Sequence, residues 1–166
     1  MSSAVLKVND ANWVKYVQRA TSPNSYTRQL IRAWVIIYLA DMQRRFNKNS
    51  RGGGDWKAIK RSTAQQKGND LILVQIGKLK NALQLGALGN KMVILGSELA
   101  AEVGFSNAMH DKKLSFNQLA RIHQNGEGNV PAREILVPPS QKAMRAMVRA
   151  SQAMFDKMSA DLKGGR

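Results

Sequence analysis

The residues that could carry catalysis or bind a metal are few in this sequence and lie far apart. It contains two histidines, His110 and His123, and no cysteine. The two histidines lack the spacing that would place two metal ligands on one helix face, and His110 is followed by Asp111 in an isolated dipeptide. Glu98 and Glu102 would lie about 13 Å apart on an extended strand, which is too far for paired carboxylates. We therefore expect no catalytic residue, no metal site and no enzymatic activity.

The glycine clusters do not match a phosphate-binding loop. Gly52, Gly53 and Gly54 are not followed by lysine and serine or threonine, and no strand is predicted before them. Gly126 and Gly128 flank a single residue, but the third glycine of a dinucleotide fingerprint is missing. The sequence thus predicts no bound cofactor.

His123 lies at the end of an apolar helical segment and is open to two interpretations. Its ring could bond a nearby carbonyl and interact favourably with the negative end of the helix dipole. Alternatively, it could be a ligand or a general base. We favour the structural interpretation, because the sequence offers no second ligand and no nucleophile for it.

The length and composition favour one globular domain over residues 1–166. Hydrophobic residues make up 43% of the chain, enough for a single sizeable core. The most apolar stretch, residues 33–40, is much shorter than the roughly 20 residues of a membrane-spanning helix. The N-terminus has no basic segment leading into an apolar one, so we expect no signal peptide. We expect a soluble protein without membrane contact, made in a reducing cytoplasm.

Positive charge is concentrated in the first half of the chain. The net charge is +15; residues 1–83 hold 15 basic and 4 acidic residues, and residues 84–166 hold 11 and 7. A basic window at residues 43–61 contains Arg44, Arg45, Lys48, Arg51, Lys57, Lys60 and Arg61. This window could be a solvated loop, a surface that meets an acidic neighbouring subunit, or a non-specific contact with passing DNA. No recognition-helix or zinc-finger pattern accompanies it, so sequence-specific DNA reading is not expected.

The N-terminal part, residues 1–46, is expected to be helical. A short helix is predicted within residues 4–20 and a long amphipathic helix over residues 27–46. The apolar side of the long helix holds Leu30, Ile31, Trp34, Ile37, Tyr38 and Met42. Its more solvent-exposed side is expected to hold Arg28, Arg32, Asp41 and Arg45. Residues 47–55 then read as a flexible basic loop.

Residues 56–137 are expected to form an α+β core. The β-branched run at residues 92–95 and the alternation at residues 99–105 predict two strands joined by a turn at residues 96–98. Residues 83–88 could pair beside them. The connections are too short for parallel crossovers, so we expect a small antiparallel sheet of three or four strands packed by helices.

Two further helices are predicted in the second half. Ser115 can cap a short helix that ends at His123. Pro138, Pro139 and Ser140 precede a long C-terminal helix over residues 140–163, in which methionines recur at steps of three and four. Such a stripe is compatible with core packing and with an interface that must adapt to a partner.

Five short segments occur in an order that resembles one protein family. They are WKAI at 56–59 with Ser-Thr at 62–63, LVQIGKL at 73–79, VILGS at 93–97, LARIHQNG at 119–126 and PAREIL at 131–136. This ordered set resembles the tail-completion or neck family of tailed-phage virion morphogenesis proteins, of the Mu-like type. Ile76 stands where the family has threonine, and Leu119 and Ile135 stand where it has aromatic residues.

The resemblance implies a structural role in the virion, at the junction between head and tail. Such a protein is assembled in the host cytoplasm as a homo-oligomeric ring, here expected to be a hexamer, that caps the tail and contacts neck, connector and tail-tube proteins. Genomic DNA would pass through the ring and could touch it non-specifically. Two alternatives are a capsid-side head-closure or connector protein in a twelvefold ring, and a basic non-specific nucleic-acid-binding module.

The motif residues that the resemblance assigns to structure or interface are Gly77, His123, Gln124, Gly126, Pro131, Ala132 and Arg133. Elementary backbone chemistry agrees with such a role. Gly126 can adopt the left-handed conformation that ends a helix, and Pro131 holds Val130 in an extended conformation. We hypothesise that this corner positions the guanidinium of Arg133 for an ion pair with a carboxylate, within the protomer or across the ring.

Overall fold

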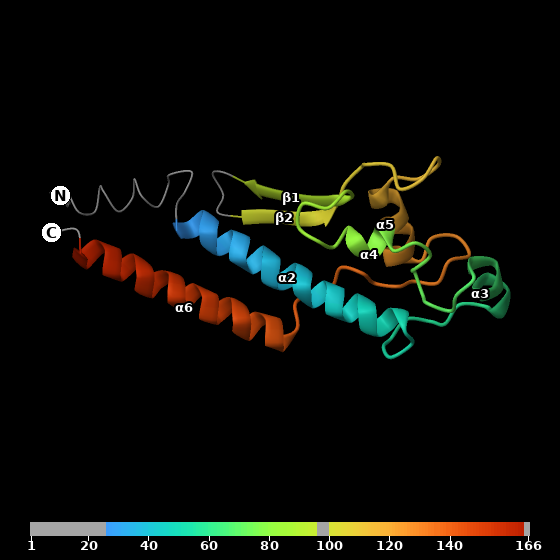
Figure 1. Cartoon of the computed structure of the whole chain (residues 1–166), viewed down its shortest axis with the longest axis horizontal. Helices are drawn as coiled ribbons and strands as arrows, with labels where there is room; N and C mark the ends of the chain where they lie inside the picture. Colours follow the sequence, from blue (N-terminus) through green and yellow to red (C-terminus); the bar gives the residue numbers. More distant parts are fainter. Residues whose placement is uncertain (1–25, 96–99, 165–166) are drawn as a thin grey trace, which may run out of the picture.

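The computed structural model describes residues 26–95 and 100–164. Its elements in chain order are α2 (Tyr26–Ser50), α3 (Arg61–Lys67), α4 (Lys78–Asn81), β1 (Asn90–Leu95), β2 (Ala100–Phe105), α5 (Phe116–Asn125) and α6 (Gln141–Gly164). The helix predicted within residues 4–20 and the turn predicted at residues 96–98 lie outside the described residues. Figure 1 shows an elongated molecule in which α2 and α6 run antiparallel, while α3, α4 and α5 gather at one end.

Mixed helix and strand structure with two long helices confirms the coarse fold prediction, but the predicted third and fourth strands do not form among the described residues. The sheet there has two antiparallel strands, β1 and β2. The segment at residues 83–88 forms consecutive turns, in which the amides of Gln84 and Ala87 donate to carbonyls three residues earlier. These local bonds use groups that a strand needs for its ladder. Leu83 is buried while Leu88 is 73% exposed, so the segment packs on the core at its start and not as a paired strand.

The β-hairpin packs against α2 through one face. Its register pairs Asn90 with Phe105 and Met92 with Val103. Phe105 is buried and Val103 is half-buried, whereas Glu102 is exposed and forms an ion pair with Lys91. The predicted alternation in this strand is therefore confirmed over residues 101–105.

The long helix α2 begins and ends close to its predicted bounds, but its buried side differs from the prediction. The buried apolar residues are Ile31, Val35, Leu39, Met42 and Phe46. The helix also continues to Ser50, so the first four residues of the predicted loop are helical. It extends this far because Ser50 is buried and its carbonyl accepts a hydrogen bond from the amide of Ile72 at 2.9 Å. Residues 51–55 form the turn that follows.

Asp41, predicted to lie on the more solvent-exposed side of this helix, is only 4% exposed. Its carboxylate accepts hydrogen bonds from the backbone amide and the hydroxyl of Ser140, each at 2.8 Å. It also forms ion pairs with Arg44 at 3.3 Å and Arg45 at 3.7 Å. Asp41 thus caps the start of α6 from a neighbouring helix, which explains its burial.

Helix α6 is attached to α2 along its length. The indole Nε1 of Trp34 donates to the carbonyl of Met147 and to the hydroxyl of Ser151, both at 3.2 Å. Near the other end of the pair, the hydroxyl of Tyr26 donates to the carboxylate of Asp161. Polar contacts at separate places therefore fix the register of the two helices.

Replacing Asp41 with alanine should destabilise the protein by about 2 kcal/mol, because the cap of α6 and two ion pairs are lost together. Urea denaturation followed by circular dichroism measures this change. Asp156→Ala is the matched control, since Asp156 is exposed on α6 and accepts a hydrogen bond from Gln152 of the same helix. Equal denaturation midpoints for the two variants would contradict the role assigned to Asp41.

Candidate functional site

The motif at residues 123–136 forms a close backbone junction at the end of α5. Gly126 has φ +73° and its amide donates to the carbonyl of Ile122, which ends the helix in a left-handed residue. A Cβ atom at this position would lie 2.7 Å from the backbone nitrogen of Ala132. Only glycine therefore allows the chain after Pro131 to return against the helix end.

Gln124 joins the end of α5 to the segment that leads to α6. Its side-chain oxygen accepts hydrogen bonds from the amides of Ile135 at 2.8 Å and Leu136 at 3.0 Å. Its side-chain nitrogen donates to the carbonyl of Leu136 at 2.8 Å. One amide side chain thus replaces the partners that a neighbouring strand would supply to this segment.

Arg133 is the buried cation of this junction, at 6% exposure. Its backbone amide donates to the carbonyl of His123 at 2.6 Å. Its Nε and Nη2 atoms donate to the carbonyl of Lys57 at 3.2 and 3.1 Å. Our hypothesis expected a carboxylate as partner, but among the described residues no ion pair to Arg133 is formed. We refer to the contacts of Gln124, Gly126 and Arg133 with residues 131–136 and Lys57 as the clasp.

Trp56 extends the clasp into the core. Its indole Nε1 donates to the carbonyl of Glu134 at 3.1 Å. Its ring packs edge-on against Phe46, with centroids 5.0 Å apart. The tryptophan of the first motif segment is therefore bound to the backbone of the last one, although the two residues are far apart in sequence.

His123 does not behave as the favoured interpretation expected. Its Nδ1 atom is buried and has no hydrogen-bond partner among the described residues. Burial, reinforced by the positive charge of Arg133, lowers the pKa of His123 to about 4. The ring is therefore neutral near pH 7 and does not interact as a cation with the helix dipole.

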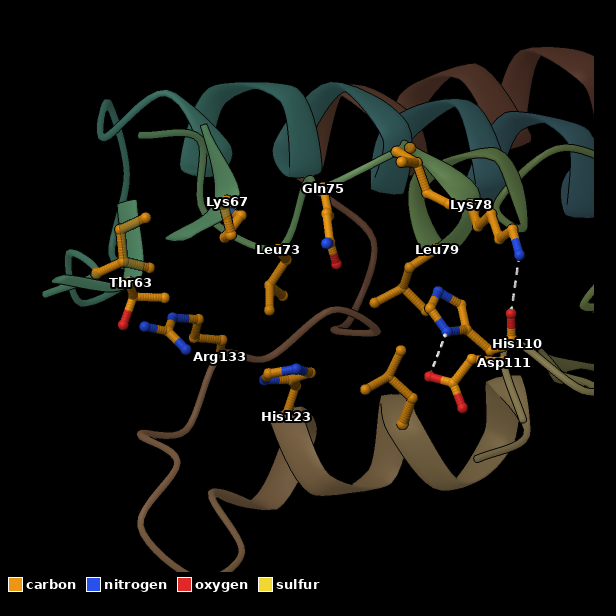
Figure 2. A pocket seen from close by; sticks show the side chains of 14 residues that line it. Thr63, Lys67, Leu73, Gln75, Lys78, Leu79, His110, Asp111, His123 and Arg133 are labelled. Atoms are coloured by element: carbon orange, nitrogen blue, oxygen red, sulfur yellow. Dashed lines mark hydrogen bonds and ion pairs between the residues drawn. The ribbon is translucent and has the colours of Figure 1, made fainter. Parts of the chain in front are cut away.

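A pocket of about 400 Å³ brings together motif residues that are distant in the sequence. In Figure 2, Arg133 and Thr63 lie at one end and Lys78, His110 and Asp111 at the other, with His123 between them on α5. Gly77, which directly precedes α4, also lines this pocket. Pro131, Ala132 and Gln124 belong to the clasp instead.

The cations around this pocket are bound to carbonyl groups. Lys67 donates to the carbonyl of Leu71, and Lys78 donates to that of His110 at 3.0 Å. Burial and the nearby charge of Arg133 lower the pKa of Lys67. A group that loses solvation and faces another cation favours binding of an anion.

Asp111 is the acidic residue of the pocket and is fully engaged locally. Its carboxylate accepts hydrogen bonds from the amides of Lys113 and Leu114, at 2.8 and 2.9 Å, and lies 3.3 Å from the ring of His110. These contacts, the two amides first, lower the pKa of Asp111 to about 2. His110 and Asp111, an isolated dipeptide in the sequence, thus stabilise the turn that follows them.

The pocket combines apolar walls with a few cations. No hydroxyl lies within hydrogen-bonding distance of a histidine among the described residues that line it. Over residues 26–95 and 100–164, no group of three or more potential metal ligands gathers. Apolar walls with a few cations can bind an anion or an amphipathic segment.

The basic window divides into two groups in the structure. Arg44 and Arg45 form ion pairs with Asp41, so part of their charge is neutralised within the protomer. The side chains of Lys48, Arg51, Lys57, Lys60 and Arg61 are exposed. They follow the C-terminal end of α2 toward α3, at the end of the molecule remote from the last turn of α6 (Figure 1).

Comparisons with protein-family models, curated proteins and solved structures found no match to this chain. Among the helices that the structure describes, none combines the length and hydropathy needed to cross a membrane.

Replacing Gly126 with alanine should destabilise the fold by about 3 kcal/mol, because left-handed strain and a contact with Ala132 add together. Gly128→Ala is a matched control: Gly128 has φ +65°, but a Cβ there would meet nothing within 4 Å. Gly128→Ala should lower the free energy of unfolding by only about 1 kcal/mol, because backbone strain is its one unfavourable effect. Urea denaturation of both variants separates the two effects, and equal losses would argue against the close approach.

Stability should fall as the pH is lowered from about 6.5 to about 4. In this range the unfolded chain protonates His123 while the folded chain does not, because the folded pKa is depressed. Denaturation midpoints across this range, with a proton NMR titration of the histidine rings, measure the effect. His123→Gln should flatten the pH dependence, and an unchanged slope in this variant would refute the assignment.

Proposed function

We propose that this protein is a non-enzymatic structural subunit of a phage virion, which forms a ring at the head–tail junction as a neck or tail-completion protein. The observation that carries the proposal is the clasp. The residues of the family-like motif bond one another's backbone, and Gln124 alone makes three such bonds. A motif used for shape in this way fits a scaffold protein, since the side chain of Gln124 and the backbone around it are engaged by the fold.

An exposed apolar stripe on α6 supports self-association. Val148 is 68% exposed and Phe155 is 54% exposed. At about 100° per residue, Met144, Val148 and Phe155 lie on one line along the helix. Ala143 and Met147, by contrast, lie roughly 90° around the helix and are buried or half-buried. The same helix can therefore pack on α2 and offer a second side to a neighbouring subunit, as a closed ring requires.

The exposed cations near α3 favour one further candidate, a basic module that binds nucleic acid non-specifically. Lys57, Lys60 and Arg61 are exposed. Among the described residues they form no ion pair, so phosphate could approach them. In a ring, the same residues could instead face DNA in the lumen. A twelvefold connector on the capsid side remains the alternative within the virion class.

The association of the purified protein tests the ring. Size-exclusion chromatography with light scattering should give a closed oligomer, expected to be a hexamer, either alone or after addition of isolated tails. Val148→Asp with Phe155→Asp should reduce the assembled fraction about tenfold, because two charges would be buried in an apolar contact.

Ala153→Asp is the matched control for this experiment. Ala153 is exposed on α6 and lies about 180° from Met144 around the helix. It should leave assembly unchanged. A protein that stays monomeric with and without tails, and that binds DNA with a steep dependence on salt, would replace the ring with the nucleic-acid-binding module.

A further inference from the structure

A second hollow adjoins the pocket of Figure 2 and shares Arg133 with it. This second hollow, of about 710 Å³, is lined in part by Lys57, Lys60 and Val130. The two share Ile59, Thr63, His123 and Arg133 as lining residues. The two hollows therefore adjoin at these residues, and together they are called here the basic groove.

Cations outnumber carboxylates around the basic groove, where the nearby charge of Asp70 offsets part of that of Lys67. The basic residues of the groove are Lys57, Lys60, Lys67, Lys78 and Arg133. Asp111 is the one carboxylate among the described lining residues, and it is already bound to two amides and a histidine. An approaching carboxylate would meet several cations, and Lys67, Lys78 and Arg133 donate to carbonyl groups, which carry no net charge to cancel the attraction.

The floor of the groove is aliphatic. Leu73, Leu79 and Leu119 line one part, and Ile59 and Val130 line the other. Ile76 is exposed at the edge. An extended peptide directs successive side chains to opposite sides, so alternating acidic and aliphatic residues could satisfy the cations and the floor together.

The shape of the groove disfavours nucleic acid as its occupant. Arg133 lies almost wholly beneath the surface, and Lys67 is half-buried. A duplex phosphate could not reach them, whereas a glutamate side chain can enter a recess. Phenylalanine, tyrosine and tryptophan are absent from the described lining, so single-stranded bases would find none of the large aromatic side chains on which they stack most strongly.

We propose that the basic groove binds an extended acidic segment of a partner protein, with carboxylates on Arg133 and the surrounding lysines and with aliphatic side chains on the leucine floor. This docking site is separate from the α6 stripe. The groove can bind its partner whether or not the chain closes into a ring.

A fluorescein-labelled octapeptide of alternating glutamate and leucine is the probe, followed by fluorescence anisotropy at pH 7 with the full chain. Lys57→Glu with Lys60→Glu should weaken binding about tenfold, because both residues are exposed and line the groove. Ile76→Ser should weaken binding about threefold through loss of apolar contact. These exposed positions permit substitution without disturbing the core.

The matched control is Lys142→Glu with Arg149→Glu, which makes the same charge change at exposed positions of α6. It should leave peptide affinity within about twofold of the parent protein. A serine-for-leucine version of the peptide should bind more weakly than the original.

Two outcomes would overturn the proposal. If the control variant loses as much affinity as the groove variant, the attraction is only that of the overall positive charge. If a thymidine oligonucleotide binds with loss at Lys57 and Lys60 while the peptide does not bind, the groove contacts nucleic acid. Neither outcome bears on the ring, which is tested by the α6 variants.

Discussion

The close approach of the Gly126 and Ala132 backbones is the constraint on which the rest of the molecule depends. A Cβ at Gly126 would lie 3.1 Å from the Cβ of Ala132, so both positions must be small. Once the chain returns there, Gln124 binds residues 135–136, and Tyr38 on α2 binds the next carbonyl, that of Val137. Ser140 then meets the carboxylate of Asp41, and this contact sets where α6 begins. The end of α5 thereby determines where α6 begins and in which direction it runs.

The way in which the protein satisfies its buried polar groups also shapes its surface charge. Arg133 and Lys67 bind carbonyls, and Asp41 engages two arginines and the start of α6. Few carboxylates remain to neutralise the other cations of a chain with net charge +15. Stability within the protomer and attraction for an acidic partner therefore arise from the same distribution of charges.

Local signals predicted the elements well, because they act over a few residues. The capping box of Ser115 and Gln118 and the alternation in β2 are patterns of this kind. The third strand predicted at residues 83–88 does not form, because backbone groups that would pair with a neighbouring strand are used in turns. The burial of Asp41 depends on Ser140, a residue 99 positions away, and no periodicity in α2 reveals it. Lys67 and Lys78 flank the apolar run at residues 71–76. This pattern could have indicated the basic groove.

Because the clasp joins the end of α5 to the segment that leads to α6, we expect it to open only when the whole domain unfolds. Native-state hydrogen exchange of the Arg133, Ile135 and Leu136 amides, all of which donate within the clasp, measures this directly. The account predicts that their opening free energies equal those of the α5 amides and fall with denaturant at the slope of global unfolding. Exchange of these three amides through a low-energy local opening, while α5 stays protected, would contradict it.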